Sequence, residues 1–181
     1  KNLNFVFLPF VRFFLNNQAV HNPNVAPSEP SVASSAAPIA SIVMPCHNAA
    51  LYVRESVQAI LAQTLSDFEL IIVEDASKDN SLALVQTLVG LDPRIRLIVH
   101  DRNLGASRSR NDGLHAARGE FIGFCDADDL WKPDKLSRQV ALLRENPSYD
   151  LTYCDSEIID AKGQLTGERF SDQFAPPDPP S

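Results

Sequence analysis

The sequence is poor in cysteine and in basic residues, and both shortages exclude classes of protein. Its three cysteines, Cys46, Cys125 and Cys154, are odd in number and have no CxxC spacing, so we expect reduced thiols at buried strand positions in a cytoplasmic compartment. Sixteen Lys and Arg stand against 23 Asp and Glu, giving a net charge of −7. This sign is wrong for binding a phosphate backbone, so we expect no nucleic-acid partner.

Long hydrophobic runs are also lacking. The apolar segment Phe5 to Leu15 would be about 16 Å long as a helix, against roughly 30 Å for a bilayer core, and it contains Pro9 and Arg12. It cannot span a membrane unaided, and we expect a loosely ordered flank. The alternatives are a truncated anchor, a remnant of something upstream, or an interfacial segment through which residues 5–15 associate peripherally with the inner face of a membrane. Because the chain starts at Lys1 and its only methionine is Met44, we expect a fragment of a longer gene product.

What the sequence does contain is a globular composition, with 44% hydrophobic and 22% charged residues. Prolines gather in a Ser/Ala/Asn-rich stretch before residue 38 and again at the end of the chain. They divide the chain into three parts. We expect an apolar flank and linker over 1–37, disordered and dispensable for folding, a folded domain over 38–170, and a Pro-rich tail over 171–181.

Within residues 38–170, short apolar runs alternate with segments of helical spacing. The runs at 39–44, 68–74, 95–100 and 120–125 predict buried strands, and a weaker one is predicted at 151–159. Apolar residues recur at helical spacing within 53–61, 82–89 and 136–143. Strands alternating with such helices require right-handed crossovers, so we predict an α/β fold with a mainly parallel sheet covered on both faces.

Ligands of such sheets bind beyond the carboxyl ends of the strands, and polar residues follow three of the predicted strands at 45–48, 74–79 and 126–129. Neither a GxGxxG nor a GxxxxGK[ST] motif is present, which excludes the usual dinucleotide fingerprint and the P-loop. Asp126 and Asp128, spaced i and i+2, offer hard oxygen ligands to Mg²⁺ or Mn²⁺. The pattern therefore predicts a metal-held diphosphate.

Each of these features has a plainer structural interpretation. Asp75 and Ser77 could cap the helix that begins near Asp79, and the acidic residues at 128–129 could serve a turn or a cap. The arginines between residues 102 and 118 could form a solvated helix face instead of contacting an anionic ligand. The histidines at 47, 100 and 115 lack a Cys or His partner at ligand spacing, so we expect structural or surface roles for them.

Three blocks of sequence carry a family resemblance: SIVMPCHNAALYVRESVQAILAQT, FELIIVEDASKDNS and NLGASRSRNDGLHAARGEFIGFCDADDLW. In order and spacing they resemble the nucleotide-sugar-dependent family 2 glycosyltransferases of the GT-A fold, from about Ala40 to Glu168. The resemblance implies a Rossmann-like, mainly parallel sheet flanked by helices. Three positions depart from the family pattern, with His47 in place of Tyr, Glu74 in place of Asp and Ala76 in place of Gly.

The resemblance also implies a site for the donor nucleotide. Pro45, His47 and Asn48 would border its base and ribose. Glu74 and Asp75 would belong to the same nucleotide-sugar site, with Asp75 hydrogen-bonded to the base.

Further along the chain, the resemblance implies that Arg110 lies alongside the base and that Asp126 approaches the ribose. Asp128 would coordinate the divalent cation, Mn²⁺ or Mg²⁺, that holds the diphosphate.

The implied activity is that of a hexosyltransferase that moves a sugar from a nucleotide diphosphate-sugar, most simply a UDP-sugar, to a hydroxyl of a saccharide or lipid-linked acceptor, with inversion. Synthesis of cell-envelope or extracellular polysaccharide is the implied setting. The acceptor half, with its general base, is expected beyond Ser181, so the alternative is a donor-half fragment that binds nucleotide without turnover. A phosphohydrolase with an aspartyl nucleophile is a weaker rival. Such enzymes carry the DxD motif on the first strand of the core, whereas in this chain the motif follows the fourth predicted strand.

Overall fold

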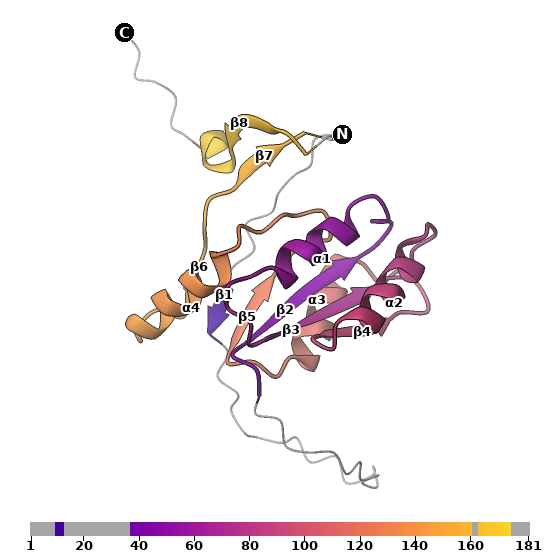
Figure 1. Cartoon of the computed structure of the whole chain (residues 1–181), viewed down its shortest axis with the longest axis horizontal. Helices are drawn as coiled ribbons and strands as arrows, with labels where there is room; N and C mark the ends of the chain where they lie inside the picture. The colour runs from indigo at the N-terminus through magenta and orange to yellow at the C-terminus, as the bar shows by residue number, and fades with distance from the viewer. Residues whose placement is uncertain (1–9, 13–36, 161–162, 175–181) are drawn as a thin grey trace, which may run out of the picture.

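The computed structural model describes residues 10–12, 37–160 and 163–174, which form a six-stranded sheet and a separate two-stranded hairpin (Figure 1). The centre of the sheet has four parallel strands in the order β4-β3-β2-β5. They are β2 (Ala40–Cys46), β3 (Phe68–Glu74), β4 (Ile95–Val99) and β5 (Phe121–Phe124). The predicted α/β class with a mainly parallel sheet is confirmed.

Helices cover both faces of this sheet, which is why β3 is buried along its whole length. Alternate residues of β2 and β3, among them Ile42, Met44 and Ile72, join one apolar cluster with α1 (Val53–Leu61), α2 (Ser81–Leu91) and α4 (Lys135–Glu145). On the opposite face, α3 (Ala106–Ala116) packs so closely on β2 that a Cβ on Gly113 would lie 2.3 Å from a methyl group of Val43.

The four predicted buried strands are present, with one difference in burial. β4 is the edge strand, and its residues after Ile95 are half-buried or exposed. The prediction of one strand over 151–159 is wrong. The segment forms β6 (Leu151–Thr152) at the far edge of the large sheet and β7 (Glu157–Ile159) in the hairpin, because residues 153–156 leave the ladder between them.

The N-terminal flank contributes a strand that the sequence analysis placed outside the folded unit. β1 (Phe10–Arg12) pairs antiparallel with both β5 and β6, so it connects β6 to the rest of the sheet. Phe10 is 1% exposed and stacks on Phe121 with ring centroids 6.0 Å apart, in space left by Gly123. The expectation that residues 1–37 are disordered is therefore wrong for Phe10–Arg12, and the other residues of the flank lie outside the described ranges.

The described chain ends in β7, β8 (Leu165–Arg169) and the 3₁₀ helix η1 (Phe170–Phe174), so ordered structure continues four residues past the expected boundary at 170. The rest of the tail lies outside the described residues. Cys46 and Cys125 are buried as expected, but Cys154 is exposed, because it lies in the segment between β6 and β7. No helix within the described ranges is long and apolar enough to cross a membrane.

Candidate functional site

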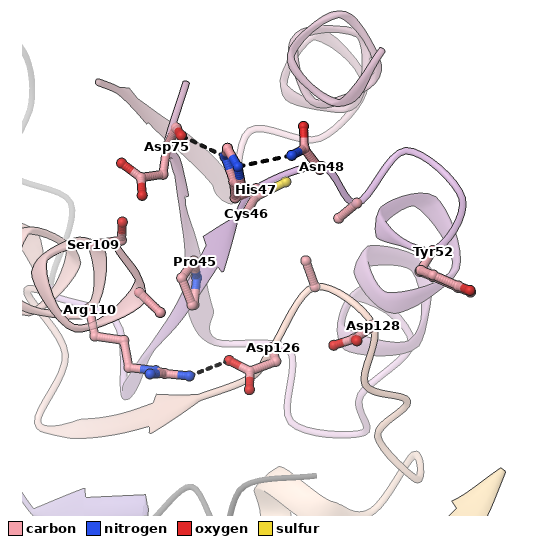
Figure 2. A pocket seen from close by; sticks show the side chains of 13 residues that line it. Pro45, Cys46, His47, Asn48, Tyr52, Asp75, Ser109, Arg110, Asp126 and Asp128 are labelled. Atoms are coloured by element: carbon pink, nitrogen blue, oxygen red, sulfur yellow. Dashed lines mark hydrogen bonds and ion pairs between the residues drawn. The ribbon is translucent and has the colours of Figure 1, made fainter. Parts of the chain in front are cut away.

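A cavity of about 280 Å³ opens at the carboxyl edge of the parallel strands (Figure 2). The turn after β2, Asp75 after β3, the first turns of α3 and the loop after β5 surround it, as expected for a parallel sheet. Its lining residues are Pro45, Cys46, His47, Asn48, Ala49, Tyr52, Asp75, Ala106, Ser109, Arg110, Asp126, Ala127 and Asp128. Seven of the eight residues predicted for the site are in this set, and Glu74 is missing from it.

The turn after β2 is cross-linked to the turn after β3 by side-chain hydrogen bonds. The Nδ1 atom of His47 lies 2.7 Å from the Asp75 carbonyl oxygen, and its Nε2 atom lies 2.9 Å and 3.0 Å from the side-chain nitrogens of Asn48 and Asn103. Because a carbonyl only accepts and an amide nitrogen only donates, Nδ1 carries the proton and Nε2 accepts. His47 is therefore fixed in one tautomer and joins the turns after β2 and β3 where they line the cavity.

Asn48 adds two more hydrogen bonds between the same turns. Its backbone N–H donates to Ser77 Oγ (2.9 Å), and its side-chain oxygen accepts from the Lys78 N–H (2.8 Å). Asn48 has φ +51°, in the left-handed region, which Asn adopts more easily than most residues. These hydrogen bonds hold the turns after β2 and β3 together at this edge of the sheet.

Asp75 is 2% exposed, and its carboxylate is held by three internal donors. Oδ1 accepts from His100 Nδ1 (2.8 Å) and the Leu104 N–H (2.8 Å), while Oδ2 accepts from the Gly105 N–H (2.7 Å). Burial raises the pKa of Asp75, but these hydrogen bonds outweigh it and the pKa lies below its ordinary value. The expected alternative role as a cap of α2 is not seen, since Asp79 accepts the Ser81 N–H there (3.0 Å).

Glu74 does not reach the cavity. It is 1% exposed, and its carboxylate accepts the Ser77 N–H (2.8 Å) beneath the turn, so the structure gives it a supporting position. Ala76, the next departure from the family pattern, has φ +53°. A glycine would adopt this left-handed conformation without the steric cost that a Cβ brings.

Arg110 and Asp126 form an ion pair across one wall of the cavity, with Nη2 2.6 Å from Oδ1 (Figure 2). Both side chains are about one-fifth exposed, and the buried Nε of Arg110 has no hydrogen-bond partner among the residues that the structure describes. The other basic residues of this segment have different positions. Arg108 is 62% exposed and pairs with Asp112, and Arg118 pairs with Glu69.

The loop after β5 carries the acidic pair. Ser56 Oγ of α1 donates to the Ala127 carbonyl (2.9 Å), and the Asp129 N–H donates to the Asp126 carbonyl (3.0 Å), which fixes the turn. Burial and the nearby Asp126 charge raise the pKa of Asp128. Asp126 and Asp128 both line the cavity, whereas Asp129 lines a neighbouring one.

Two carboxylates with hard oxygen atoms suit a divalent cation. The pKa of Asp128 is raised first by burial and then by the Asp126 charge, and a cation between the two carboxylates would offset that charge. The described residues contain no group of three or more His, Cys, Asp or Glu arranged to hold a metal. Asp126 and Asp128 therefore fit a cation that takes further ligands from phosphate or water.

Several residues of this site were not predicted from the sequence. Tyr52, Ala106 and Ser109 line the cavity, and His100 contacts Asp75 from the end of β4. The position of His100 as the last residue of the predicted strand over 95–100 was the available signal. Cys46 also lines the cavity, but burial and the charge of Glu74 raise its pKa to about 12, so it is a neutral thiol.

Solved structures share this fold. The crystal structure of S. aureus TarS 1-349 in complex with UDP superposes with a TM-score of 0.55 and 27% identity, covering 60% of this chain and 32% of the TarS 1-349 chain. The mannosyltransferase PcManGT from Pyrobaculum calidifontis, in complex with GDP-Man and Mn²⁺, gives a TM-score of 0.55 and 26% identity, covering 60% and 33%. The fold and the polar edge of the sheet thus define a Rossmann-like domain of the GT-A class.

Sequence comparison makes the assignment specific. The model of the family described as glycosyl transferase family 2 matches residues 41–166, and the chain belongs to that family. The UDP-Glc:alpha-D-GlcNAc-diphosphoundecaprenol beta-1,3-glucosyltransferase WfgD of Escherichia coli is 37% identical over 119 residues, covering 66% of this chain and 46% of WfgD. The chain spans 42–54% of the length of three curated relatives that it matches.

Proposed function

We propose that this chain is the donor-binding half of an inverting glycosyltransferase that moves a hexose from a UDP-sugar to an acceptor hydroxyl. The observation that carries the proposal is the polar cavity where Asp75, Arg110, Asp126 and Asp128 converge in a family 2 chain. TarS has been solved with UDP, and the name of WfgD includes UDP-Glc, which supports a UDP-sugar donor here.

In this proposal the turns after β2 and β3 hold the nucleoside. Pro45, His47 and Asn48 border the base and the ribose, and the Asp75 carboxylate accepts a hydrogen bond from the base. Arg110 lies beside the base and keeps Asp126 oriented through their ion pair. Asp126 approaches the ribose hydroxyls. Glu74 supports the turn from below and contacts no ligand.

Asp128, together with Asp126, would hold Mn²⁺ or Mg²⁺. A bound divalent cation stabilises the negative charge of a leaving diphosphate as a Lewis acid. PcManGT, solved with GDP-Man and Mn²⁺, supports this assignment. The contribution of this chain is to bring both carboxylates to one wall of the cavity, where Ser56 fixes the loop that carries them.

The acceptor is expected to be a saccharide or a lipid-linked saccharide in cell-envelope polysaccharide synthesis. The name of WfgD includes a diphosphoundecaprenol acceptor, which supports the lipid-linked form and a cytoplasmic reaction at the inner face of the membrane. The general base is expected outside these residues. Loss of a base costs roughly 10²- to 10⁴-fold in rate, so we expect donor binding with little transfer. Membership of family 2 leaves the phosphohydrolase alternative without support.

The proposal is tested by calorimetry of UDP binding with and without Mn²⁺. Wild type should bind more tightly with Mn²⁺, and Asp128→Asn should abolish that gain. Asp75→Ala should weaken binding about tenfold or more under both conditions, because a hydrogen bond to a charged group is lost.

Asp67→Asn is the matched control. Asp67 is exposed at the opposite end of β3, where its backbone carbonyl accepts the Ile39 N–H, and the variant should bind like wild type. Equal affinity for UDP in wild type, Asp75→Ala and Asp128→Asn would refute the assignment of the cavity.

A further inference from the structure

Asp75 is held by two histidines that come from different loops. His47, after β2, donates to its backbone carbonyl, and His100, after β4, contacts its carboxylate with Nδ1 2.8 Å from Oδ1 (Figure 2 shows His47 and Asp75). The position of the carboxylate at the cavity is thus determined from both sides. His47 belongs to the expected nucleotide site, whereas no role has been assigned to His100.

His100 is placed rigidly. Its backbone N–H donates to the Glu74 carbonyl (2.9 Å), and its side chain is 9% exposed. Its Nε2 atom lies 3.2 Å from Asp112 Oδ2 on α3, an electrostatic contact that falls short of hydrogen-bond geometry. Asp112 in turn accepts from Arg108 Nε (2.8 Å). The imidazole therefore bridges the carboxylate at the cavity and a carboxylate of α3, the helix that also carries Arg110.

The three internal donors leave the Asp75 carboxylate little further capacity. A carboxylate has about four lone-pair sites, and His100, Leu104 and Gly105 occupy three of them. The remaining site is on Oδ2, because Oδ1 already accepts twice. The remaining lone pair of Asp75 Oδ2 has a fixed direction, so it can accept one N–H of a ligand. It repels a ligand atom that presents a lone pair at the same position.

From this geometry we propose that His100 is a positioning residue that orients Asp75 toward a single nucleobase N–H and so sets the base selectivity of the donor site. The proposal rests on the proposed function, since it needs the nucleotide in this cavity. Uracil presents an N–H at N3, whereas cytosine presents a lone pair there. UDP should therefore bind more tightly than CDP, and the preference should depend on the Nδ1 side of His100.

Two conservative variants separate the two ring nitrogens. Asn places an amide N–H near the Nδ1 position, so His100→Asn keeps the donor to Asp75. Gln extends its amide toward the Nε2 position, so His100→Gln keeps the group facing Asp112 and loses that donor. Calorimetry on the full 181-residue chain should give a UDP-to-CDP affinity ratio within about twofold of wild type for His100→Asn. The ratio should fall at least about fivefold for His100→Gln.

A role of His100 in packing alone predicts a different pattern. His100→Gln with an unchanged ratio, or equal losses in both variants, would overturn the proposal. So would a wild-type chain that binds UDP and CDP equally, although the nucleotide site itself would then stand. A wild type that binds neither nucleotide would refute the proposed function and this inference together.

Controls keep the result interpretable. His115→Leu, at an exposed position in the last turn of α3, should leave the ratio unchanged. Thermal midpoints establish that each variant folds. If His100→Gln does not fold, His100→Leu decides, because it also lacks the donor at the Nδ1 position. A ratio reduced at least about fivefold supports the proposal, and an unchanged ratio overturns it.

Discussion

The central strands of the six-stranded sheet are held by burial in a core, whereas the β7–β8 hairpin lies largely exposed to solvent. In the sheet, β2 and β3 are almost wholly buried, and residues about thirty positions apart join the turns at their ends. In the hairpin every residue of β8 is exposed. Its side-chain interactions are polar, such as the hydrogen bond that Ser171 Oγ donates to Asp155 (2.8 Å) and the ion pair of Lys132 with Glu157.

This difference extends to the two cavities. The nucleotide cavity is lined by turns that the core positions. A second one, of about 650 Å³, lies between α4, the loop after β5 and the hairpin, and residues such as Trp131 and Leu165 line it from both sides. The family pattern over residues 41–166 ends within β8, and the side of the second cavity that belongs to the core, with Trp131, comes from the loop after β5 of the larger sheet and not from the hairpin. Substitutions in the sheet should therefore cost stability that equivalent changes in the hairpin do not.

The largest effect is expected for Phe10→Ala. Phe10 is 1% exposed and stacks on Phe121, so its truncation should lower the free energy of unfolding by about 3 kcal/mol or more. Urea denaturation measures the loss. Leu165→Ala in β8, where Leu165 is 65% exposed, is the matched control and should change stability by less than about 0.5 kcal/mol. A loss below about 1 kcal/mol for Phe10→Ala would restore the view of the flank as dispensable.

An intermediate effect, dependent on pH, is expected for Glu69→Gln. Glu69 is 3% exposed and accepts from Ser41 Oγ (2.7 Å), Arg96 (2.7 Å) and Arg118 (2.9 Å). Burial raises the pKa of Glu69, but these bonds outweigh it and hold the pKa below the ordinary 4.5. A carboxyl whose pKa is lower in the folded state stabilises the fold above its ordinary pKa, and this contribution is lost as the pH falls through the folded value.

Glu69→Gln should therefore destabilise the chain by about 1–2 kcal/mol at pH 7, since both arginines are partly solvated. The deficit relative to wild type should shrink below about pH 4.5, as wild-type Glu69 begins to protonate. Denaturant titrations across this pH range measure it. Glu168→Gln on exposed β8 should show no such dependence. A deficit that stays constant with pH would contradict the charge-based account.

The smallest effect has the opposite sign. Ala76 has φ +53°, so Ala76→Gly should relieve steric strain in the folded chain. Glycine also raises the entropy of the unfolded chain, which offsets part of this gain, so the free energy of unfolding should rise by about 0.5 kcal/mol. The same substitution in the middle of α1, Ala59→Gly, should lower it by about 0.5–1 kcal/mol. Thermal unfolding compares the two. Losses in both variants would show that the turn after β3 does not strain its alanine.

The sequence was most informative where burial is greatest. The runs that became β2 and β3 are continuous apolar stretches, and their ends placed Pro45, His47, Asn48 and Asp75 at the cavity. Glu74 does not line the cavity, because neighbouring residues at the end of a strand point in opposite directions and its side chain lies beneath the turn.

The features that the sequence could not predict depend on contacts between residues that are far apart in the chain. Phe10–Arg12 lies in a short apolar run with no alternation, and its partners in β5 and β6 follow more than a hundred residues later. The contact between His100 and Asp75 depends on the register that sets Val99 beside Glu74. The roles of the cavity residues toward a nucleotide stay predictions.

The place of β1 in the sheet has a consequence for the order of folding. Phe10 pairs with Gly123 and with Thr152, so β1 waits for partners that are made more than a hundred residues later. At roughly 5–20 residues per second, synthesis from residue 10 to residue 152 takes about 7–28 s. The parallel strands β2, β3 and β4 can pair during that time, whereas β1 waits for β5, and β6 joins the sheet through β1. On the ribosome, β1 therefore enters the sheet after strands that are made later than it is.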